Sequence, residues 1–411
     1  VLYTSCSTSE RTDVEGKLFK KIASGDSDIE FNNAIVETED FNLYTYNYIY
    51  DGSGVAVGDI NNDGLADIYF TGNASANKLY LNEGNFKFKD ISEAAGVAGD
   101  DRWMTGTTMA DVNNDGYLDI YISVAGQTED RENLLFINNG DLTFTEAAAD
   151  YGIDDNGAST QATFFDYDKD GDLDMYLINR PVDFNIARNA FLATRHIASD
   201  TDTDKLYSFE DGRFIDKTDE AGLRSYDYGQ SVTIGDLNND NWPDIYISGD
   251  FQTPDFMYIN NGDGTFTDQL TDYTGHVSFS AMGTDINDFN NDGWLDIIEL
   301  DMVAEDHVRK KTMMGAMAPE AFWRTVNEGY HFQYMFNSLQ MNNGNNTFSE
   351  IAKMSGIAET DWSWSPLLAD LNDDGWKDLF VTNGIIKDVN DNDYNNAINK
   401  QAQLGVQLDF L

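Results

Sequence analysis

Short apolar runs, rich in β-branched and aromatic residues, alternate along the chain with clusters of Asp, Asn and Gly. Two examples are DIYFTGN at residues 67–73 and DIYISVAG at residues 119–126. Such runs are too short for typical helices, and their residue types favour strands. The Gly- and Asn-rich segments between them are typical of turns. The pattern therefore predicts an all-β fold.

One acidic stretch recurs six times. Its copies begin at Asp59, Asp111, Asp166, Asp236, Asp288 and Asp370. An apolar segment such as GVAVGD precedes each copy, and a segment ending in Asn and then an aromatic-headed segment usually follow, as in KLYLNEG and FKFKDISEAAGV. Repeated units of four short strands are typical of a β-propeller. We therefore predict a propeller of four-stranded blades, with six or seven blades.

Each acidic stretch places oxygen donors at its positions 1, 3, 5, 7 and 9, and the donor at position 7 is the backbone carbonyl. Hard oxygen donors at this spacing suit Ca²⁺, whereas Mg²⁺ keeps more waters and demands a stricter octahedron. A glycine at position 6 permits the left-handed turn that wraps the loop around an ion. Two carboxylates about 4 Å apart repel by about 4 kcal/mol at an effective dielectric constant near 20, so several converging carboxylates need a cation. The sequence thus predicts up to six calcium sites.

The predicted ligands are five residues in each loop. They are Asp59, Asn61, Asp63, Leu65 and Asp67; Asp111, Asn113, Asp115, Tyr117 and Asp119; Asp166, Asp168, Asp170, Asp172 and Asp174; Asp236, Asn238, Asp240, Trp242 and Asp244; Asp288, Asn290, Asp292, Trp294 and Asp296; and Asp370, Asn372, Asp374, Trp376 and Asp378. The third loop carries the most charge and is predicted to bind most tightly. In the fourth loop Asn241 replaces the glycine, which is acceptable because asparagine tolerates the left-handed conformation.

The 411 residues carry a formal net charge of -48, with 25 Lys and Arg against 73 Asp and Glu. Nucleic acid and anionic membrane surfaces would repel such a chain, whereas divalent cations would be attracted to it. An aromatic content of 13% excludes the disordered acidic class. No apolar run approaches the roughly 20 residues of a membrane-spanning helix.

A single cysteine, Cys6, rules out an internal disulfide. The opening VLYTSCSTSE resembles the end of a bacterial lipoprotein signal, in which the cysteine is lipidated, although Tyr3 stands where such signals prefer an aliphatic residue. Two interpretations stay open: a lipid anchor at Cys6, with residues 1–16 as leader or tether, and an ordinary cysteine in a frayed terminus.

The loops, together with GVAVGD and LYLNEG, resemble FG-GAP or VCBS repeats, the calcium-loop blades also found in integrin α-chain propellers. Residues 299–317, 329–344 and 360–393 resemble the large VCBS-repeat proteins of Bacteroidota, which are related to cartilage acidic proteins and often carry an ASPIC/UnbV domain. The resemblance implies an exported calcium-binding propeller, often a surface lipoprotein. It implies no particular activity, because such blades serve adhesion, glycan binding and enzymes.

Three segments depart from the repeat, which as a whole is expected to occupy residues 17–411. Residues 301–334 form an insertion with a basic, Met-rich stretch, interpreted as a helical excursion packed on the propeller rather than as a docking surface. Residues 390–411 are predicted to form a polar helical tail. The segment KLFKKIASGDSDIEF at 17–31 resembles an aromatic-headed strand that closes the ring against the last blade.

No catalytic residues are predicted. The four histidines lack metal-ligand spacing, and no nucleophile elbow, Walker loop or dinucleotide fingerprint occurs. Trp362 and Trp364 suit either sugar stacking or packing between blades. The favoured function is an exported, calcium-stabilised scaffold for adhesion or ligand binding, in an outer-membrane surface assembly whose partners are proteins or glycans. The alternative is a propeller enzyme that acts on polysaccharide as a lyase or hydrolase.

Overall fold

The computed structural model describes residues 18–43, 45–127, 130–182, 199–250, 253–313, 319–385, 391–393, 396 and 400. The predicted tether at residues 1–16 and the predicted lipidation site at Cys6 lie outside the described residues, as does most of the predicted tail. Among the described residues of that tail, 392, 393, 396 and 400 are helical.

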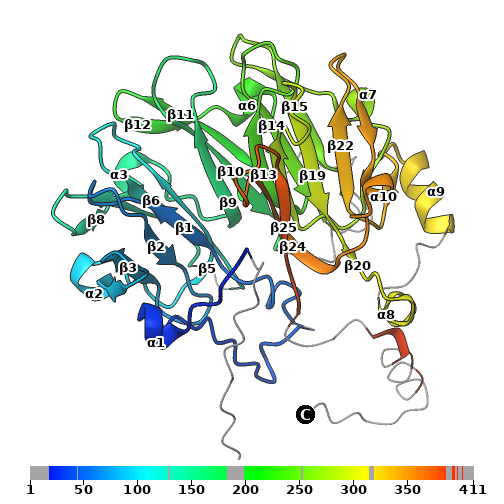
Figure 1. The fold of residues 1–411 in the computed structure, drawn as a ribbon. Coiled ribbons are helices and arrows are strands. Elements are labelled where there is room, and N and C mark those ends of the chain that lie inside the picture. Colours follow the sequence, from blue (N-terminus) through cyan, green and yellow to red (C-terminus); the bar gives the residue numbers. More distant parts are fainter. Residues whose placement is uncertain are drawn as a thin grey trace, which may run out of the picture.

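Five antiparallel sheets of four strands each follow one another in chain order, from blue to orange in Figure 1. Their strands are β1 (Val55–Gly58), β2 (Asp67–Phe70), β3 (Lys78–Asn82) and β4 (Phe88–Asp90); β5 (Trp103–Ala110), β6 (Asp119–Ala125), β7 (Leu134–Asn138) and β8 (Phe144–Glu146); β9 (Ala158–Phe165), β10 (Asp174–Arg180), β11 (Lys205–Glu210) and β12 (Arg213–Asp216); β13 (Gly229–Gly235), β14 (Asp244–Gly249), β15 (Phe256–Asn260) and β16 (Phe266–Asp268); and β18 (Gly283–Asn287), β19 (Asp296–Leu300), β22 (Ser338–Asn342) and β23 (Phe348–Glu350). We number these sheets blades 1 to 5. The predicted all-β propeller is confirmed.

Blade 6 is smaller. It consists of β24 (Asp361–Ala369), β25 (Asp378–Asn383) and the two-residue strand β20 (Met302–Val303), in the order β20-β24-β25. Its β24 and β25 correspond to the first and second strands of the other blades, because the sixth acidic stretch joins them. A short parallel pair, β17 (Val277–Ser278) and β21 (Gln333–Tyr334), lies outside the blades.

The first strands of neighbouring blades contact one another. The Thr108 hydroxyl on β5 donates to the carbonyl of Ala162 on β9 (2.7 Å), and the Asn287 amide on β18 donates to the carbonyl of Leu368 on β24 (3.0 Å). The second strands lie deeper in the blades: every residue of β6, β10, β14 and β19 is buried. This burial supplies the main stabilisation, because apolar area removed from water contributes about 25 cal/mol per Å².

A one-turn helix follows the fourth strand of each complete blade. These helices are α2 (Ser92–Ala95), α3 (Ala148–Tyr151), α6 (Thr218–Ala221), α7 (Leu270–Tyr273) and α10 (Ala352–Ser355). All except α7 end on a glycine with positive φ, such as Gly96 at 78°. A glycine in this conformation is the usual helix stop.

The predicted strand within residues 17–31 is wrong. The described part from residue 18 contains no strand, and residues Ser24–Ser27 form the short helix α1. A contact with the last blade does exist, since the ring centroids of Phe19 and Phe380 on β25 lie 5.9 Å apart. Among the described residues, blade 6 also has no third strand with which this segment could pair, and a strand without such a partner is not stable by itself.

The insertion between β19 and β22 is mainly helical, as predicted, with α8 (His307–Thr312) and α9 (Pro319–Asn327). Arg309 on α8 binds both carboxylate oxygens of Asp361 (2.7 and 3.0 Å), and Lys310 pairs with Glu359. Met313 is buried in one apolar cluster with Trp362. These contacts anchor α8 to blade 6 and support the packing interpretation of the insertion.

Candidate functional site

All six acidic stretches are hairpin loops that join the first strand of a blade to its second strand. Because every blade has the same strand order, these loops lie at the same end of the propeller. Neighbouring loops contact one another: the side-chain amides of Asn62, Asn239 and Asn291 donate to the glycine carbonyl of the following loop at 2.9, 3.2 and 2.8 Å. These bonds link the loops of blades 1 and 2 and the loops of blades 4, 5 and 6.

The first loop shows how each stretch folds. Asp59 accepts hydrogen bonds from the backbone N–H groups of Asp63 (3.1 Å) and Gly64 (2.7 Å). Asn61 accepts from the N–H of Asp63 (3.2 Å), and Asp63 accepts from the N–H of Leu65 (2.8 Å). These bonds draw the side chains at positions 1, 3 and 5 to the inside of the turn. The bond from the position-6 N–H to the position-1 carboxylate recurs in all six loops, at 2.7 to 3.2 Å.

Two positions of each loop have left-handed backbone. Position 6 has φ between 72° and 96°, and Asn241 adopts 72° as the sequence predicts. Position 4 is also left-handed, with φ between 57° and 63°. We had not predicted this second position, although its signal was present: position 4 is Asn in four of the six loops, and asparagine is the residue after glycine that best tolerates this conformation.

The aspartate at position 9 connects the loop to the third strand of its blade. In blade 1 one carboxylate oxygen of Asp67 accepts from the N–H of Ile60 (3.0 Å), and the other accepts from the N–H of Asn82 on β3 (2.7 Å). Asp119, Asp174, Asp244 and Asp296 repeat this arrangement. The predicted calcium ligand at position 9 therefore also organises the blade.

Burial changes the acidity of these position-9 carboxyls. Desolvation, followed by the charges of the other loop aspartates, raises the pKa values of Asp119, Asp174 and Asp244 to about 7. Hydrogen bonds from backbone N–H groups lower the pKa values of these carboxyls, but they offset the effect of burial only in part. A cation next to these carboxylates would favour their ionised forms.

The third loop brings its carboxylates closest together. Oxygen atoms of Asp166, Asp168 and Asp174 all lie within 4.8 Å of one another. Burial and then the neighbouring charge of Asp170 raise the pKa of Asp168. Three converging carboxylates match the all-oxygen coordination that calcium prefers, so the residues present fit this ion. The sequence had indicated the same loop as the most charged.

In blades 4 and 5 the side chain at position 7 packs against the turn that follows the third strand. A Cβ atom added at Gly262 would lie 2.8 Å from the Trp242 ring, and one added at Gly344 would lie 2.9 Å from the Trp294 ring. Both glycines stand two residues after the Asn that ends the third strand. The aromatic ring thus packs directly on this turn, which explains why the turn needs glycine. The ammonium nitrogen of Lys169 in the third loop also lies over the Trp242 ring, 4.2 Å from its centroid.

The asparagine that ends the third strand joins neighbouring blades. The side chain of Asn138 donates to the carbonyls of Leu118 in its own loop (3.1 Å) and Ile60 in the preceding loop (2.8 Å). Asn260 and Asn342 make the equivalent pairs of bonds. The recurrent Asn in the sequence therefore marks a bridge between loops, a role that only the register of the strands reveals.

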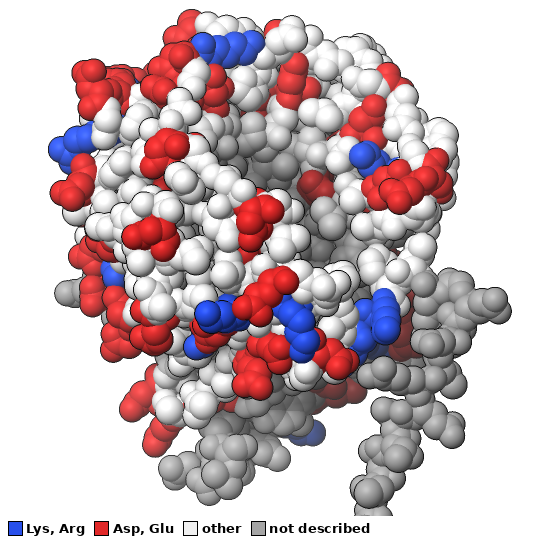
Figure 2. Space-filling model, turned by 60° about the vertical axis from the view of Figure 1, so that its left-hand side comes forward, with Lys and Arg blue, Asp and Glu red and all other residues white. Residues whose placement is uncertain are grey.

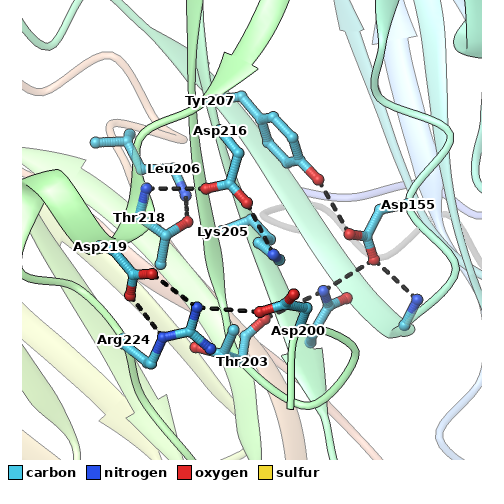
Figure 3. A network of polar contacts seen from close by, with 12 residues as sticks. Asp155, Asp200, Thr203, Lys205, Leu206, Tyr207, Asp216, Thr218, Asp219 and Arg224 are labelled. Carbon is cyan, nitrogen blue, oxygen red and sulfur yellow. Dashed lines mark hydrogen bonds and ion pairs between the residues drawn. The ribbon is translucent and has the colours of Figure 1, made fainter. Parts of the chain in front are cut away.

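Basic side chains around blade 3 are held in ion pairs (Figure 3). Lys205 contacts Asp216 (2.8 Å), and Arg224 contacts Asp219 (2.6 Å) and Asp200 (3.0 Å). Figure 2 likewise shows acidic side chains scattered over the surface, with the few basic ones close to them. These basic groups are thus already neutralised by carboxylates, which disfavours this region as a site for acidic polysaccharide.

Blades 3 and 4 contain buried acids that we had not predicted. Asp204 and Asp255 precede their third strands and accept an N–H from the second strand, at 2.9 Å in both cases. Blades 1, 2 and 5 place Asn77, Asn133 and Asn337 in this role. In blade 4 this Asp also influences a second buried acid: burial and then the charge of Asp255 raise the pKa of Glu299. Comparison with the other blades shows that these acids take the place of an Asn whose side chain accepts the same kind of backbone hydrogen bond.

Asp255→Asn should stabilise the protein at alkaline pH. Burial raises the pKa of Asp255 to about 6, from about 4 in the unfolded chain. An acid whose pKa is raised on folding costs no stability below pH 4, costs progressively more between pH 4 and 6, and costs a constant amount above about pH 6. We expect a gain of about 1–3 kcal/mol at pH 8 that fades towards pH 4.

Urea unfolding at several pH values in saturating calcium would measure this difference. The control is Asp272→Asn, an exposed aspartate on α7 of the same blade. If both variants had the same pH profile as the original protein, the buried pair would not influence stability.

Trp362 and Trp364 have structural contacts. Trp362 is buried among the residues of the insertion, and the Trp364 indole donates to the carbonyl of Gly384 (2.7 Å). Of the two interpretations, packing is the one that the geometry favours.

Together, the fold and the loops define the class: a β-propeller whose blades each carry an acidic hairpin loop. A model of the FG-GAP-like repeat matches residues 59–122, 123–177 and 321–381. FG-GAP-like repeats are therefore present at these residues, as the sequence motifs had indicated.

Two cartilage acidic proteins and one integrin α-chain are similar to this chain in sequence. The chain is 28% identical to human cartilage acidic protein 1 over 289 residues, which is 65% of this chain and 41% of the relative. It is 26% identical to the Xenopus tropicalis protein of the same name over 267 residues, or 60% of this chain and 39% of the relative. Integrin alpha-8 of Gallus gallus is 36% identical over 105 residues, or 22% of this chain and 10% of the relative. The chain therefore spans about two-fifths of the length of the cartilage acidic proteins that it matches.

Within the described ranges, no helix is both long enough and apolar enough to cross a membrane.

Proposed function

We propose that the six acidic loops bind Ca²⁺ and that the ions hold the blades of an exported ligand-binding scaffold in place. The observation that carries the proposal is the convergence of Asp166, Asp168 and Asp174 within 4.8 Å, in a loop whose backbone fold recurs in every blade. The ligands are the thirty residues predicted from the sequence, with side-chain oxygens at positions 1, 3, 5 and 9 and the carbonyl at position 7.

Calcium would act on more than its own loop. The position-9 aspartate of blades 1 to 5 also accepts an N–H from the third strand, and three of the position-4 asparagines, Asn62, Asn239 and Asn291, contact the following loop. An ion that orders one loop would therefore stabilise its blade and the next loop as well. This is a scaffold whose rigidity depends on calcium outside the cell, where millimolar calcium makes such sites effective.

We further propose that the scaffold works at the cell surface, in an outer-membrane assembly to which a lipid on Cys6 attaches it, and that its ligand is a protein or a glycan. The match to an integrin α-chain supports the adhesive function, and the FG-GAP repeats support the calcium requirement. The formal charge of -48 disfavours polyanionic ligands unless calcium bridges them.

Arrays of glycans and extracellular proteins, probed with the purified chain, test this function. We expect saturable binding to at least one ligand in millimolar calcium and its loss on chelation. Parallel assays with acidic polysaccharides test the competing enzyme hypothesis. Turnover at catalytic rates would overturn the scaffold and favour a lyase or hydrolase.

A further inference from the structure

A group of aromatic rings reaches the surface where the insertion returns to blade 5. Trp323 on α9 is 55% exposed, and Phe332 and Tyr334, which lie beside and within β21, are 37% and 38% exposed. Figure 1 shows α9 at the edge of the molecule, outside the sheets of the blades. We call these three residues, together with Phe322, the aromatic platform.

The rings of the platform hold one another in place. The ring centroid of Phe322 lies 5.2 Å from that of Trp323, with the two planes nearly perpendicular. The same centroid lies 6.2 Å from that of Phe332 and 5.4 Å from that of Tyr334. Tyr334 stacks in turn on Phe336, which is buried in the apolar cluster of blades 5 and 6. Rings that are already fixed lose little conformational entropy when a ligand stacks on them.

Polar side chains surround Trp323 on α9. Glu320, Arg324 and Asn327 lie within about one turn of it, and all three are exposed. Glu320 and Arg324 have the spacing at which ion pairs form on a helix. Within the ranges that the structure describes, however, the side chains of these three residues make no hydrogen bond or ion pair. A carboxylate, a guanidinium and an amide are thus available beside the exposed indole, and together they offer both donors and acceptors.

An exposed aromatic ring with free planar polar groups beside it matches the chemistry of a sugar. A pyranose with equatorial hydroxyls carries C–H groups on its two faces, which stack on an aromatic ring, and hydroxyls around its rim, which hydrogen-bond to such polar groups. A protein partner is matched less well, because binding hot spots lie in closed, desolvated pockets, whereas Trp323 stands among exposed polar side chains. The formal charge of -48 disfavours an acidic polysaccharide or an anionic membrane.

We propose that the aromatic platform binds a neutral oligosaccharide of β-linked pyranoses with equatorial hydroxyls. Trp323 stacks on one sugar residue, and the free polar groups of α9 bind its hydroxyls. Tyr334 and Phe332 offer rings to a neighbouring sugar residue, so an oligosaccharide fits better than a monosaccharide. This inference rests on the proposed scaffold, because it narrows the ligand from a protein or a glycan to a neutral glycan and assigns the site.

Cellotetraose and chitotetraose, which are neutral β-linked tetrasaccharides, test the platform by isothermal titration calorimetry with the full chain in millimolar calcium. We expect saturable binding of at least one of them. Trp323→Ala should weaken this binding roughly tenfold, the effect of losing about 1.4 kcal/mol. It should not lower the melting temperature, since the ring is exposed. Trp323→Phe should restore most of the affinity, because it keeps an aromatic face.

The matched control is Phe86→Ala, which removes an exposed ring from blade 1, outside the platform. It should leave the affinity for the tetrasaccharide unchanged. Three results would overturn the proposal: no saturable binding of either tetrasaccharide, the same affinity in Trp323→Ala as in the original protein, or equal losses in Trp323→Ala and Phe86→Ala.

The arrays of glycans and extracellular proteins separate failure of this site from failure of the scaffold. If a protein binds in calcium but no neutral glycan does, the platform proposal is wrong and the scaffold stands. Dependence of that protein ligand on Trp323 would assign the platform to protein docking instead. If nothing on the arrays binds, both proposals are wrong.

Discussion

Removal of calcium should lower the melting temperature of this protein by more than about 10 °C. A single site at a calcium concentration a hundred times its Kd adds about 2.7 kcal/mol, and six sites act on one cooperative ring of blades. Without the ions, the aspartates at positions 1, 5 and 9 of each loop, and also Asp168 at position 3 of the third loop, repel one another. Differential scanning calorimetry in millimolar calcium and in excess EDTA would measure the change.

The control must separate specific binding from general screening, because a net charge of -48 is itself relieved by salt. We therefore compare calcium, magnesium and sodium chloride at equal ionic strength. Calcium should restore the original melting temperature after chelation, and magnesium should restore much less. Identical melting curves in calcium and EDTA at matched ionic strength would rule out structural calcium.

The propeller and its loops could be predicted because both depend on local chemistry that is repeated. Each blade repeats the same alternation of strand and turn, and each loop repeats the same oxygen donors. One copy would be weak evidence, but six copies in step with four predicted strands left few alternatives. The left-handed backbone at Asn241 followed from the same comparison of one repeat with another.

Other features depend on contacts between segments far apart in the sequence. To predict the second hydrogen bond of Asp67, one must know that the N–H of Asn82 lies opposite its carboxylate. To predict the bond from Asn138 to Ile60, one must know how two blades pack together. Neither contact can be inferred from the residues next to it in the sequence. The buried Asp255 looks like any other aspartate until the Asn at the same place in other blades is compared with it.

The error at residues 17–31 has a related cause. An aromatic-headed segment becomes a strand only when a third strand lies beside it, and the described part of blade 6 contains none. Without that partner the local sequence decides, and Ser-Gly-Asp-Ser at residues 24–27 forms a turn of helix instead. Strand propensity is therefore a weak guide at the edge of a sheet.

Asp170→Asn should have opposite effects on stability with and without calcium. The side chain keeps an oxygen that accepts the N–H of Asp172, a bond of 3.0 Å, so the loop fold is preserved. In calcium the variant loses one charged ligand of the third loop, and we expect its affinity for the ion to fall by roughly ten- to a hundredfold, or about 1.4 to 2.8 kcal/mol. In EDTA the variant relieves the repulsion with Asp168 and should melt at the same temperature as the original protein or higher.

Asp172→Asn provides the matched control, because it removes the same charge from the same loop. Its side chain is exposed, and only its carbonyl belongs to the predicted ligand set. This variant should therefore keep the calcium affinity of the original protein in isothermal titration calorimetry. A reversal of sign between calcium and EDTA that occurs for Asp170→Asn alone would identify the position-5 carboxylate as a ligand, because a general charge effect moves both variants in the same direction. Equal behaviour of the two variants would instead indicate that the loop is an acidic turn that binds no ion.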